Sequence, residues 1–200
     1  MSRFGYLHTP MPTDASSVAQ ADGHLALMDA LGIRRAAVIG ASAGAPSAMQ
    51  LAIRHPERCQ ALVLLVPMAY RPTELVSSVS PISPTMEKIL MAIVSSDFSF
   101  WLATKLAPNM VIRLVLATPP KVLASATIDE RARAQRIMSD IQPISRRGLG
   151  ILNDARISSS LTRLDLEKIH ARTLVLSVRD DLYGTFTSAQ YTAEQIPGAK

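Results

Sequence analysis

Apolar residues first recur every three or four positions between residues 14 and 32, a spacing that predicts a helix capped by Asp14 and ended by Gly32. Two continuous apolar runs follow, at residues 36–39 and 61–67, and both have the length of strands in a parallel sheet that is covered on its two faces. Residues 43–54, between these runs, predict a second helix. The order of strand, helix and strand indicates an α/β fold with right-handed crossovers.

After residue 70 the pattern changes. Residues 71–163 show only helical spacings, interrupted by prolines, and no convincing strand. A strand pattern returns at residues 173–178, and a last helix is predicted at 188–196. We therefore predict a parallel sheet with helices on both faces, built from residues 1–70 and 164–200, and a helical cap inserted over residues 71–163.

Composition narrows the function classes. The chain of 200 residues is 48% hydrophobic, enough for a substantial core, and carries a net charge of +5. The basic residues are scattered and aromatic residues make up only 4%, which argues against nucleic-acid binding. Charges and a proline interrupt the longest apolar region, 89–118, so no membrane span is predicted. Cys59 is the only cysteine, and no metal or cofactor motif is present. No apolar leader opens the chain, and we expect a cytoplasmic protein.

The residues Gly40-Ala41-Ser42-Ala43-Gly44 fit the pattern G-x-S-x-G, between a predicted strand and a predicted helix. In such a turn the serine backbone is strained, and glycines avoid collisions with the neighbouring helix and strand. The turn would present the Ser42 hydroxyl at the carboxyl edge of the sheet, with the Ala43 N–H directed at a developing oxyanion. The alternative is that these small residues only permit close packing.

Residues 2–70, with "RRAAVIGASAGAPSAMQLAIRHPERCQALVLLVP" at their centre, resemble the α/β-hydrolase superfamily, and residues 165–200 resemble it as well. The likeness is to capped serine hydrolases, which include esterases, C–C bond hydrolases and cofactor-free perhydrolases. It implies that Ser42 is the nucleophile and that the Ala43 N–H is an oxyanion donor. Alignment of "TLVLSVRDDLYG" with the family strand places the orienting acid at Asp181, with Asp180 as the alternative.

A serine nucleophile needs a general base to accept the proton of its hydroxyl, and the histidine that serves as this base in the family is missing from this pattern. The family histidine follows one more strand, and the chain ends at Lys200 where that strand would begin. Of the four histidines, His24 and His55 are expected at the surface and His170 at the opposite edge of the sheet. His8, on an N-terminal loop, is the only alternative base in the chain. The family oxyanion loop would also precede residue 1, so we expect a chain truncated at both ends, with its base histidine beyond Lys200.

The resemblance therefore implies a serine hydrolase that acts on an ester or similar acyl substrate through an acyl-enzyme. Without its base, this chain is expected to be nearly inactive. The alternative is a catalytically inactive binding protein that retains Ser42 and Asp181. Apolar cap positions suggest an apolar substrate, although they could equally be cap core: Leu90, Ile93, Trp101, Leu102 and Val111. Phe98, Phe100 and Trp101 could instead form an interface, and a homodimer is left open.

Overall fold

The computed structural model describes residues 2–70, 72, 92 and 96–200 of the chain. It divides into two compact units, one formed by Met1–Val79 with Leu149–Lys200 and the other by Ser80–Gly148. The predicted insertion at residues 71–163 overlaps the second unit, and its role as a cap stays a prediction.

Three parallel strands form the sheet of the first unit, in the order β1 (Ala36–Ala41), β2 (Cys59–Leu65) and β3 (Arg172–Leu176). All three strands were predicted from the apolar runs. The first is two residues longer than expected and reaches Ala41, which pairs with Leu65, and Leu65 in turn pairs with Leu176. This register aligns the carboxyl ends of the three strands at one edge of the sheet.

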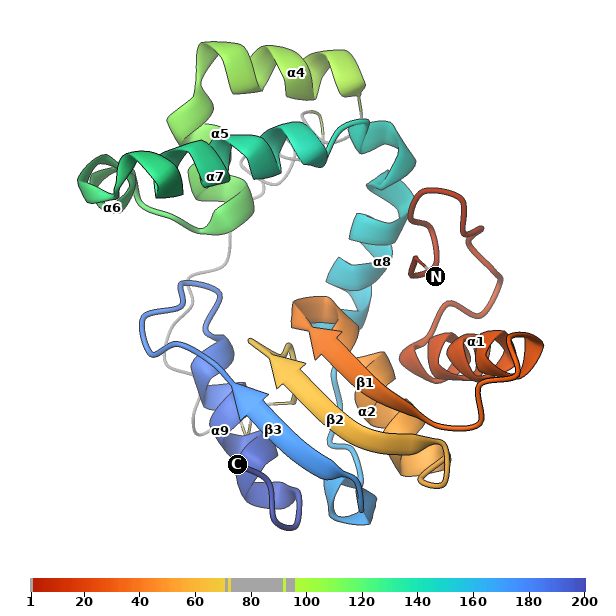
Figure 1. Cartoon of the computed structure of the whole chain (residues 1–200). Helices are drawn as coiled ribbons and strands as arrows, with labels where there is room; N and C mark the ends of the chain where they lie inside the picture. Colours follow the sequence, from red (N-terminus) through yellow and green to blue (C-terminus); the bar gives the residue numbers. More distant parts are fainter. Residues whose placement is uncertain (1, 71, 73–91, 93–95) are drawn as a thin grey trace. The chain divides into compact units, whose positions relative to one another are not determined.

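The helices of the first unit flank this sheet, and Figure 1 shows α2 and α9 behind the three strands. The helices and short 3₁₀ turns are α1 (Ser17–Ala30), η1 (Ser42–Gly44), α2 (Ala45–Arg54), α8 (Gly148–Ser159), η4 (Leu166–Lys168) and α9 (Thr185–Gln195). The predicted cap of α1 was wrong by two residues. Ser16 caps it by accepting the Ala19 N–H at 3.1 Å, whereas Asp14 accepts the N–H of Ser16 itself.

The hydrophobic core lies on one face of the sheet. Leu62 and Leu64 of β2 are fully buried in one cluster with Met49 and Leu51 of α2. Cys59 belongs to the same cluster, and burial raises the pKa of its thiol, as suits a structural rather than a reactive cysteine.

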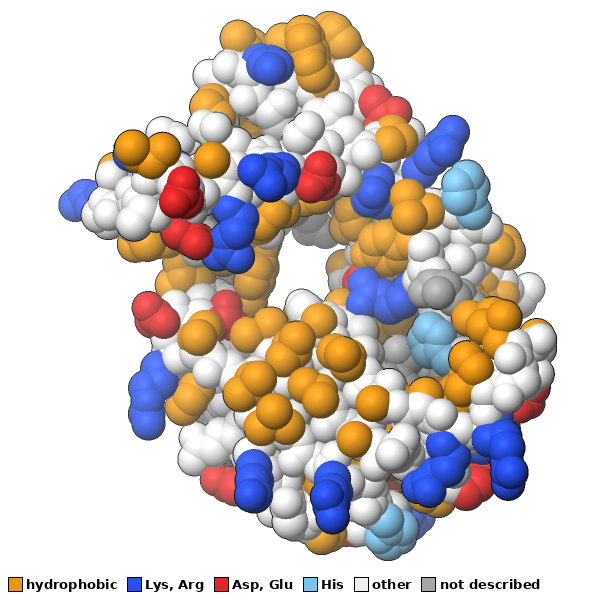
Figure 2. Space-filling model, viewed as in Figure 1, with side chains coloured by type: hydrophobic (Ala, Val, Ile, Leu, Met, Phe, Trp, Pro, Cys, Tyr) orange, Lys and Arg blue, Asp and Glu red, His pale blue; other side chains and the backbone are white. Residues whose placement is uncertain are grey.

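The opposite face of the sheet is exposed. The register places Ile39, Val63 and Leu174 in one row across the three strands and Leu176 in the next row. The exposed fractions are 67% for Ile39, 40% for Leu174 and 48% for Leu176. In Figure 2 hydrophobic side chains spread over this face of the strands. No residue that the structure describes buries this apolar face.

The outer edge of β3 is paired at one point. The Lys200 N–H donates to the Thr173 carbonyl at 3.1 Å, and the Val175 N–H donates to the Lys200 carbonyl at 2.7 Å. This is the bonding of a parallel bridge, so Lys200 lies beside β3 as the first residue of a parallel strand would.

The second unit is helical between residues 96 and 148, as predicted. Its elements are α4 (Asp97–Leu106), α5 (Pro108–Leu116), α6 (Pro120–Ser125), α7 (Ile128–Asp140) and the 3₁₀ turn η3 (Ile144–Arg146). Phe98 and Trp101 are exposed and stacked, with ring centroids 6.0 Å apart, whereas Phe100 is fully buried. Phe100 therefore cannot belong to a surface patch, and that expectation was wrong. Leu90 and Ile93 lie outside the described residues.

Candidate active site

Ser42 occupies the tight turn between β1 and α2. Its φ is +49°, in the left-handed region that residues other than glycine rarely adopt, and its side chain is exposed. The strained backbone expected for the G-x-S-x-G turn is thus present. Because β1 ends at Ala41, the serine follows directly on the carboxyl end of its strand. Such strain, held by the surrounding structure, is often found at functional positions.

Close packing explains the first glycine of the motif. A Cβ built on Gly40 would lie 2.7 Å from the Ala48 Cβ and 2.9 Å from the Ala45 Cα, both on α2. Gly44 is less confined, since a Cβ there would meet only the Arg3 Nη1, at 3.2 Å. The helix can therefore start beside the end of β1 only because residue 40 has no side chain.

Two backbone hydrogen bonds fix the Ser42 carbonyl in the turn. The carbonyl accepts the Ala45 N–H and, at 3.1 Å, the Met68 N–H from the segment after β2. Ala43 lies in the first turn that follows, where helices leave N–H groups without internal partners and carry partial positive charge. An anion that forms beside the Ser42 hydroxyl would find this donor within the same turn.

Asp181 is held by the start of α9, whereas Asp180 is exposed. One Asp181 carboxylate oxygen accepts the Tyr183 N–H at 3.1 Å, and the other accepts the Thr185 N–H at 3.1 Å and the Thr185 hydroxyl. Each carboxylate oxygen has two lone pairs, so these bonds orient the group without exhausting it. Asp181 is the more fixed of the two acids. No hydrogen bond or ion pair between described residues joins it to Ser42.

The described histidines leave the base of Ser42 unassigned. His24, expected at the surface, is half-buried on α1, where burial and the charge of Arg3 lower its pKa. The His55 ring lies 3.3 Å from an Asp22 oxygen, and His170 is exposed just before β3. His8 is exposed on the N-terminal loop. In the part of the chain that the structure describes, none of the four hydrogen-bonds to Ser42.

A cavity of about 300 Å³ opens next to the serine turn. Its lining includes Met68, whose N–H donates to the Ser42 carbonyl. It also includes Tyr183 and Thr185, whose N–H groups donate to the Asp181 carboxylate. Tyr70, Ser158, Leu161 and Ser188 complete most of its wall. The cavity thus mixes apolar side chains with hydroxyls, and its lining includes residues that hydrogen-bond to Ser42 and to Asp181. The sequence suggested apolar cap positions as a substrate pocket or as cap core, and it did not single out the residues that line this cavity.

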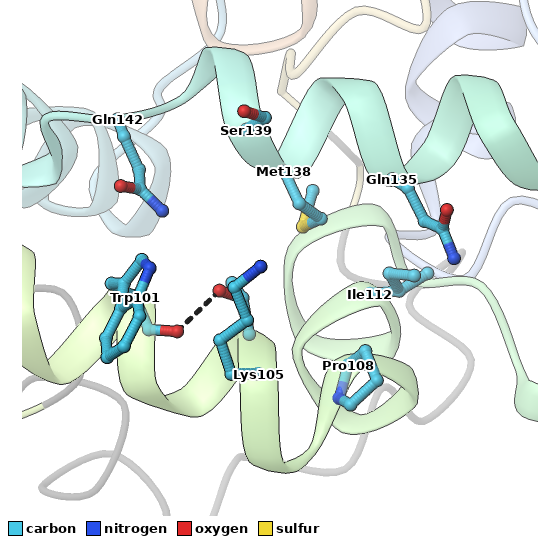
Figure 3. A pocket seen from close by; sticks show the side chains of 9 residues that line it. Trp101, Lys105, Pro108, Ile112, Gln135, Met138, Ser139 and Gln142 are labelled. Carbon is cyan, nitrogen blue, oxygen red and sulfur yellow. Dashed lines mark hydrogen bonds between the residues drawn. The ribbon is translucent and has the colours of Figure 1, made fainter.

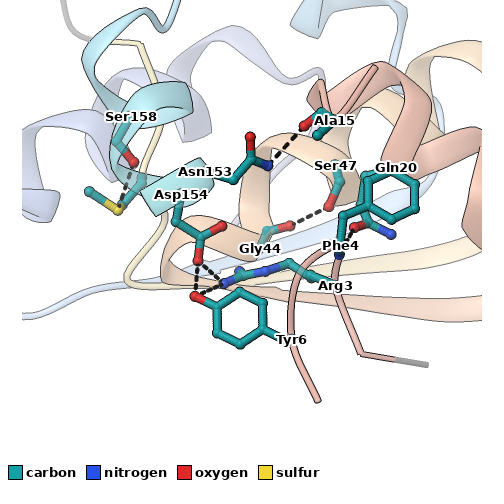
Figure 4. A network of polar contacts seen from close by, with 11 residues as sticks. Arg3, Phe4, Tyr6, Ala15, Gln20, Gly44, Ser47, Asn153, Asp154 and Ser158 are labelled. Atoms are coloured by element: carbon teal, nitrogen blue, oxygen red, sulfur yellow. Dashed lines mark hydrogen bonds and ion pairs between the residues drawn. The ribbon is translucent and has the colours of Figure 1, made fainter. Parts of the chain in front are cut away.

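Sequence reasoning also missed a polar cluster that joins the N-terminal loop to α8 (Figure 4). Arg3 and the Tyr6 hydroxyl both donate to the Asp154 carboxylate on α8. Burial raises the pKa of Asp154 against the opposing effects of Tyr6 and Arg3. Burial, then the hydrogen bond to Asp154 and its charge, raise the pKa of Tyr6 to about 12. No local pattern pairs residues this distant in sequence, so only the tertiary structure could have revealed the cluster.

Residues 2–115 match the family model described as the alpha/beta hydrolase fold, more than half of the chain. The chain belongs to this family. Of the described helices, none combines the length and apolarity that crossing a bilayer requires, and no described group of three or more His, Cys, Asp or Glu residues could hold a metal ion.

The most similar relatives include a 2-hydroxymuconate semialdehyde hydrolase of Pseudomonas putida, 40% identical over 65 residues, 32% of this chain. That match spans 23% of the relative, about a quarter of its length. An alpha/beta hydrolase fold protein from Nakamurella multipartita has a TM-score of 0.63 at 27% identity, covering 100% of this chain and 70% of that one. The enol-lactonase from Burkholderia xenovorans LB400 has a TM-score of 0.65 at 22% identity, covers 100% of this chain and 68% of its own, and supports the fold alone.

Proposed function

We propose that this chain carries the nucleophile of a serine hydrolase that acts on an ester or a similar acyl compound. The observation that carries the proposal is the left-handed backbone of Ser42 at the junction of β1 and α2, with Ala43 next to it in the same 3₁₀ turn. Membership of the alpha/beta hydrolase fold family and the hydrolase name of the 40% identical relative support the same reaction class.

In the proposed reaction the Ser42 Oγ attacks the substrate carbonyl carbon and its proton passes to a base. The tetrahedral oxyanion accepts the Ala43 N–H and collapses to an acyl-serine as the leaving alcohol takes the proton back from the base. Water then attacks the acyl-serine by the same steps and releases the carboxylic acid. Asp181, or Asp180 as the alternative, would orient the base, and the cavity at Met68 would hold the acyl group.

The base is the part of this proposal that the described residues do not supply. A histidine outside these 200 residues would complete the site, with His8 the only alternative within them. Without the base the serine hydroxyl remains a poor nucleophile, so we expect this chain alone to turn over very slowly. Carbon–carbon cleavage and perhydrolysis use the same serine chemistry and remain alternatives for the substrate class.

The second candidate function is a binding protein without catalysis. It is favoured by one observation, that no described histidine hydrogen-bonds to Ser42. On that alternative the cavity beside the turn binds a small molecule that is never transformed. For either function we also propose that the protein is cytoplasmic and that it can form a homodimer.

Labelling of the chain with a fluorophosphonate, with and without added imidazole, distinguishes the two functions. Imidazole in solution can replace a missing histidine base. If the chain is a hydrolase, we therefore expect slow labelling at Ser42 and slow hydrolysis of p-nitrophenyl butyrate, and imidazole should accelerate both. Mass spectrometry should locate the label at Ser42. Ser42→Ala should abolish it, whereas Ser125→Ala, an exposed serine on α6, should not.

Each other outcome has a definite meaning. If labelling is rapid without imidazole and His8→Ala abolishes it, His8 is the base. A folded chain that reacts under neither condition would contradict the hydrolase and leave the binding protein.

A further inference from the structure

The second unit contains a ligand-sized pocket that the serine chemistry does not use. It has a volume of about 470 Å³, within the usual range for small-molecule sites, and its lining residues come from α4, α5, α7 and the turn after α7. All of them belong to the second unit, so the pocket is complete without Ser42 or the sheet.

An apolar floor and an aromatic wall define the shape of this pocket (Figure 3). Ile112 of α5 and Met138 of α7 form the floor, and both are buried, with exposed fractions of 2% and 5%. The Trp101 indole forms the wall and is 44% exposed. Phe98 stacks against Trp101 with an interplanar angle of 29° and thereby restricts the indole. A flat hydrocarbon group is the shape that fits against such a wall.

One uncompensated positive charge stands beside the indole. Lys105 lies four residues after Trp101 on α4, so both side chains share one face of the helix. Among the described lining residues Lys105 is the only charged side chain, and no described carboxylate lies within ion-pair distance of its ammonium. Gln135 and Gln142 add two amides on the opposite side, as Figure 3 shows. The pocket therefore offers one cation, two amides and an apolar surface.

We propose that this pocket binds a small, flat, apolar monocarboxylate. The carboxylate pairs with the Lys105 ammonium, the hydrocarbon part lies against Trp101 over Ile112 and Met138, and the Gln135 and Gln142 amides bind any further oxygen of the ligand. A single positive charge matches a monocarboxylate, because a more highly charged anion would keep charge unpaired against the apolar floor. This site does not depend on the proposed hydrolase function.

Trp101 makes the test direct, since it is the only tryptophan of the chain. The probes are 3-phenylpropionate and the uncharged 3-phenylpropionamide, which have nearly the same shape. Titration calorimetry and tryptophan fluorescence of the whole chain should show the carboxylate binding about fivefold tighter than the amide. The difference should shrink as salt is added, because the site is open to solvent.

Three variants complete the experiment. Lys105→Met should remove the preference for the carboxylate and keep the amide affinity, whereas Lys121→Met, an exposed lysine of α6, should keep both. Ser42→Ala should also keep both, which separates this site from the proposed nucleophile. Equal binding of the two probes to the wild type, an unchanged preference in Lys105→Met, or no binding of either probe at millimolar concentration would overturn the proposal.

Discussion

Gly40 and Gly44 flank Ser42 symmetrically in the sequence but not in space. The helix α2 passes so close to residue 40 that an added Cβ would touch both the Ala45 backbone and the Ala48 side chain. At residue 44 the added atom would meet one flexible guanidinium, and the φ of −83° suits any residue. The motif therefore contains one glycine that packing requires and one that it tolerates.

Alanine substitutions should separate these two glycines. Gly40→Ala is expected to lower the free energy of unfolding by about 1–3 kcal/mol, because the helix and strand must move apart to admit the methyl group. Gly44→Ala should change it by only about 0.5 kcal/mol, because the Arg3 side chain can shift. Urea unfolding of the two variants and the wild type measures both values. Equal losses would show that the close approach at residue 40 does not confine the turn.

At the scale of elements, α8 is fastened to the N-terminal loop through several bonds. Arg3 and Tyr6 both donate to Asp154, the Gly150 N–H donates to the Gly5 carbonyl at 3.1 Å, and Asn153 donates to the Ala15 carbonyl. A Cβ on Gly150 would overlap the Tyr6 ring, so the helix can lie this close only with glycine there.

The raised pKa of Tyr6 predicts how this attachment responds to alkali. Burial and the hydrogen bond to Asp154 raise the pKa of Tyr6 from its ordinary value of 10.0, expected in the unfolded chain, to about 12 in the folded chain. Its contribution to stability is therefore complete below about pH 10 and declines as the pH rises toward 12, since the unfolded chain loses the proton first. The difference in unfolding free energy between wild type and Tyr6→Phe should narrow between about pH 10 and pH 12.

Val122→Ala is the control for that pH series, because it removes only exposed apolar atoms and no titratable group. Its difference from the wild type should not vary with pH. If the Tyr6→Phe difference is equally constant, the Tyr6 hydroxyl is not held by Asp154 in the way described.

For the molecule as a whole, the exposed apolar face of the sheet favours self-association. Ile39 of β1 and Leu174 and Leu176 of β3 lie on one face of the sheet, on either side of β2, with 40–67% of their surface accessible. Contiguous apolar patches of this kind favour association, and among the described residues no strand pairs with the outer edge of β1. We expect the chain to associate with itself through this face, which is one form of the homodimer left open by the sequence.

A lysine on the exposed face should reduce that association. Ile39→Lys is expected to weaken binding of an apolar dye such as ANS and to raise severalfold the concentration at which the chain associates. Leu106→Lys, at an apolar position of the second unit that is 75% exposed, should change neither. Light scattering after size-exclusion chromatography measures both variants. A wild-type chain that stays monomeric at high concentration would contradict the prediction.

The sequence by itself determined the parts of this protein that depend on neighbours along the chain. Continuous apolar runs identified the three strands, and the pattern around Ser42 identified the turn. Both are recognisable because strand burial and turn geometry depend on residues that are consecutive in the sequence. It also singled out Asp181, which the structure finds fixed at the start of α9. The same reasoning misjudged the cap of α1, where two side chains two residues apart compete for one role.

Tertiary structure alone decided the rest. It joined Arg3 to Asp154 across 151 positions, brought Met68 beside Ser42, and set Gln142 opposite Trp101 in the second pocket. It also showed that one face of the sheet is exposed among the described residues, although continuous apolar runs are typical of strands covered on both faces. These pairings depend on how distant segments pack, and no periodicity in the sequence records them.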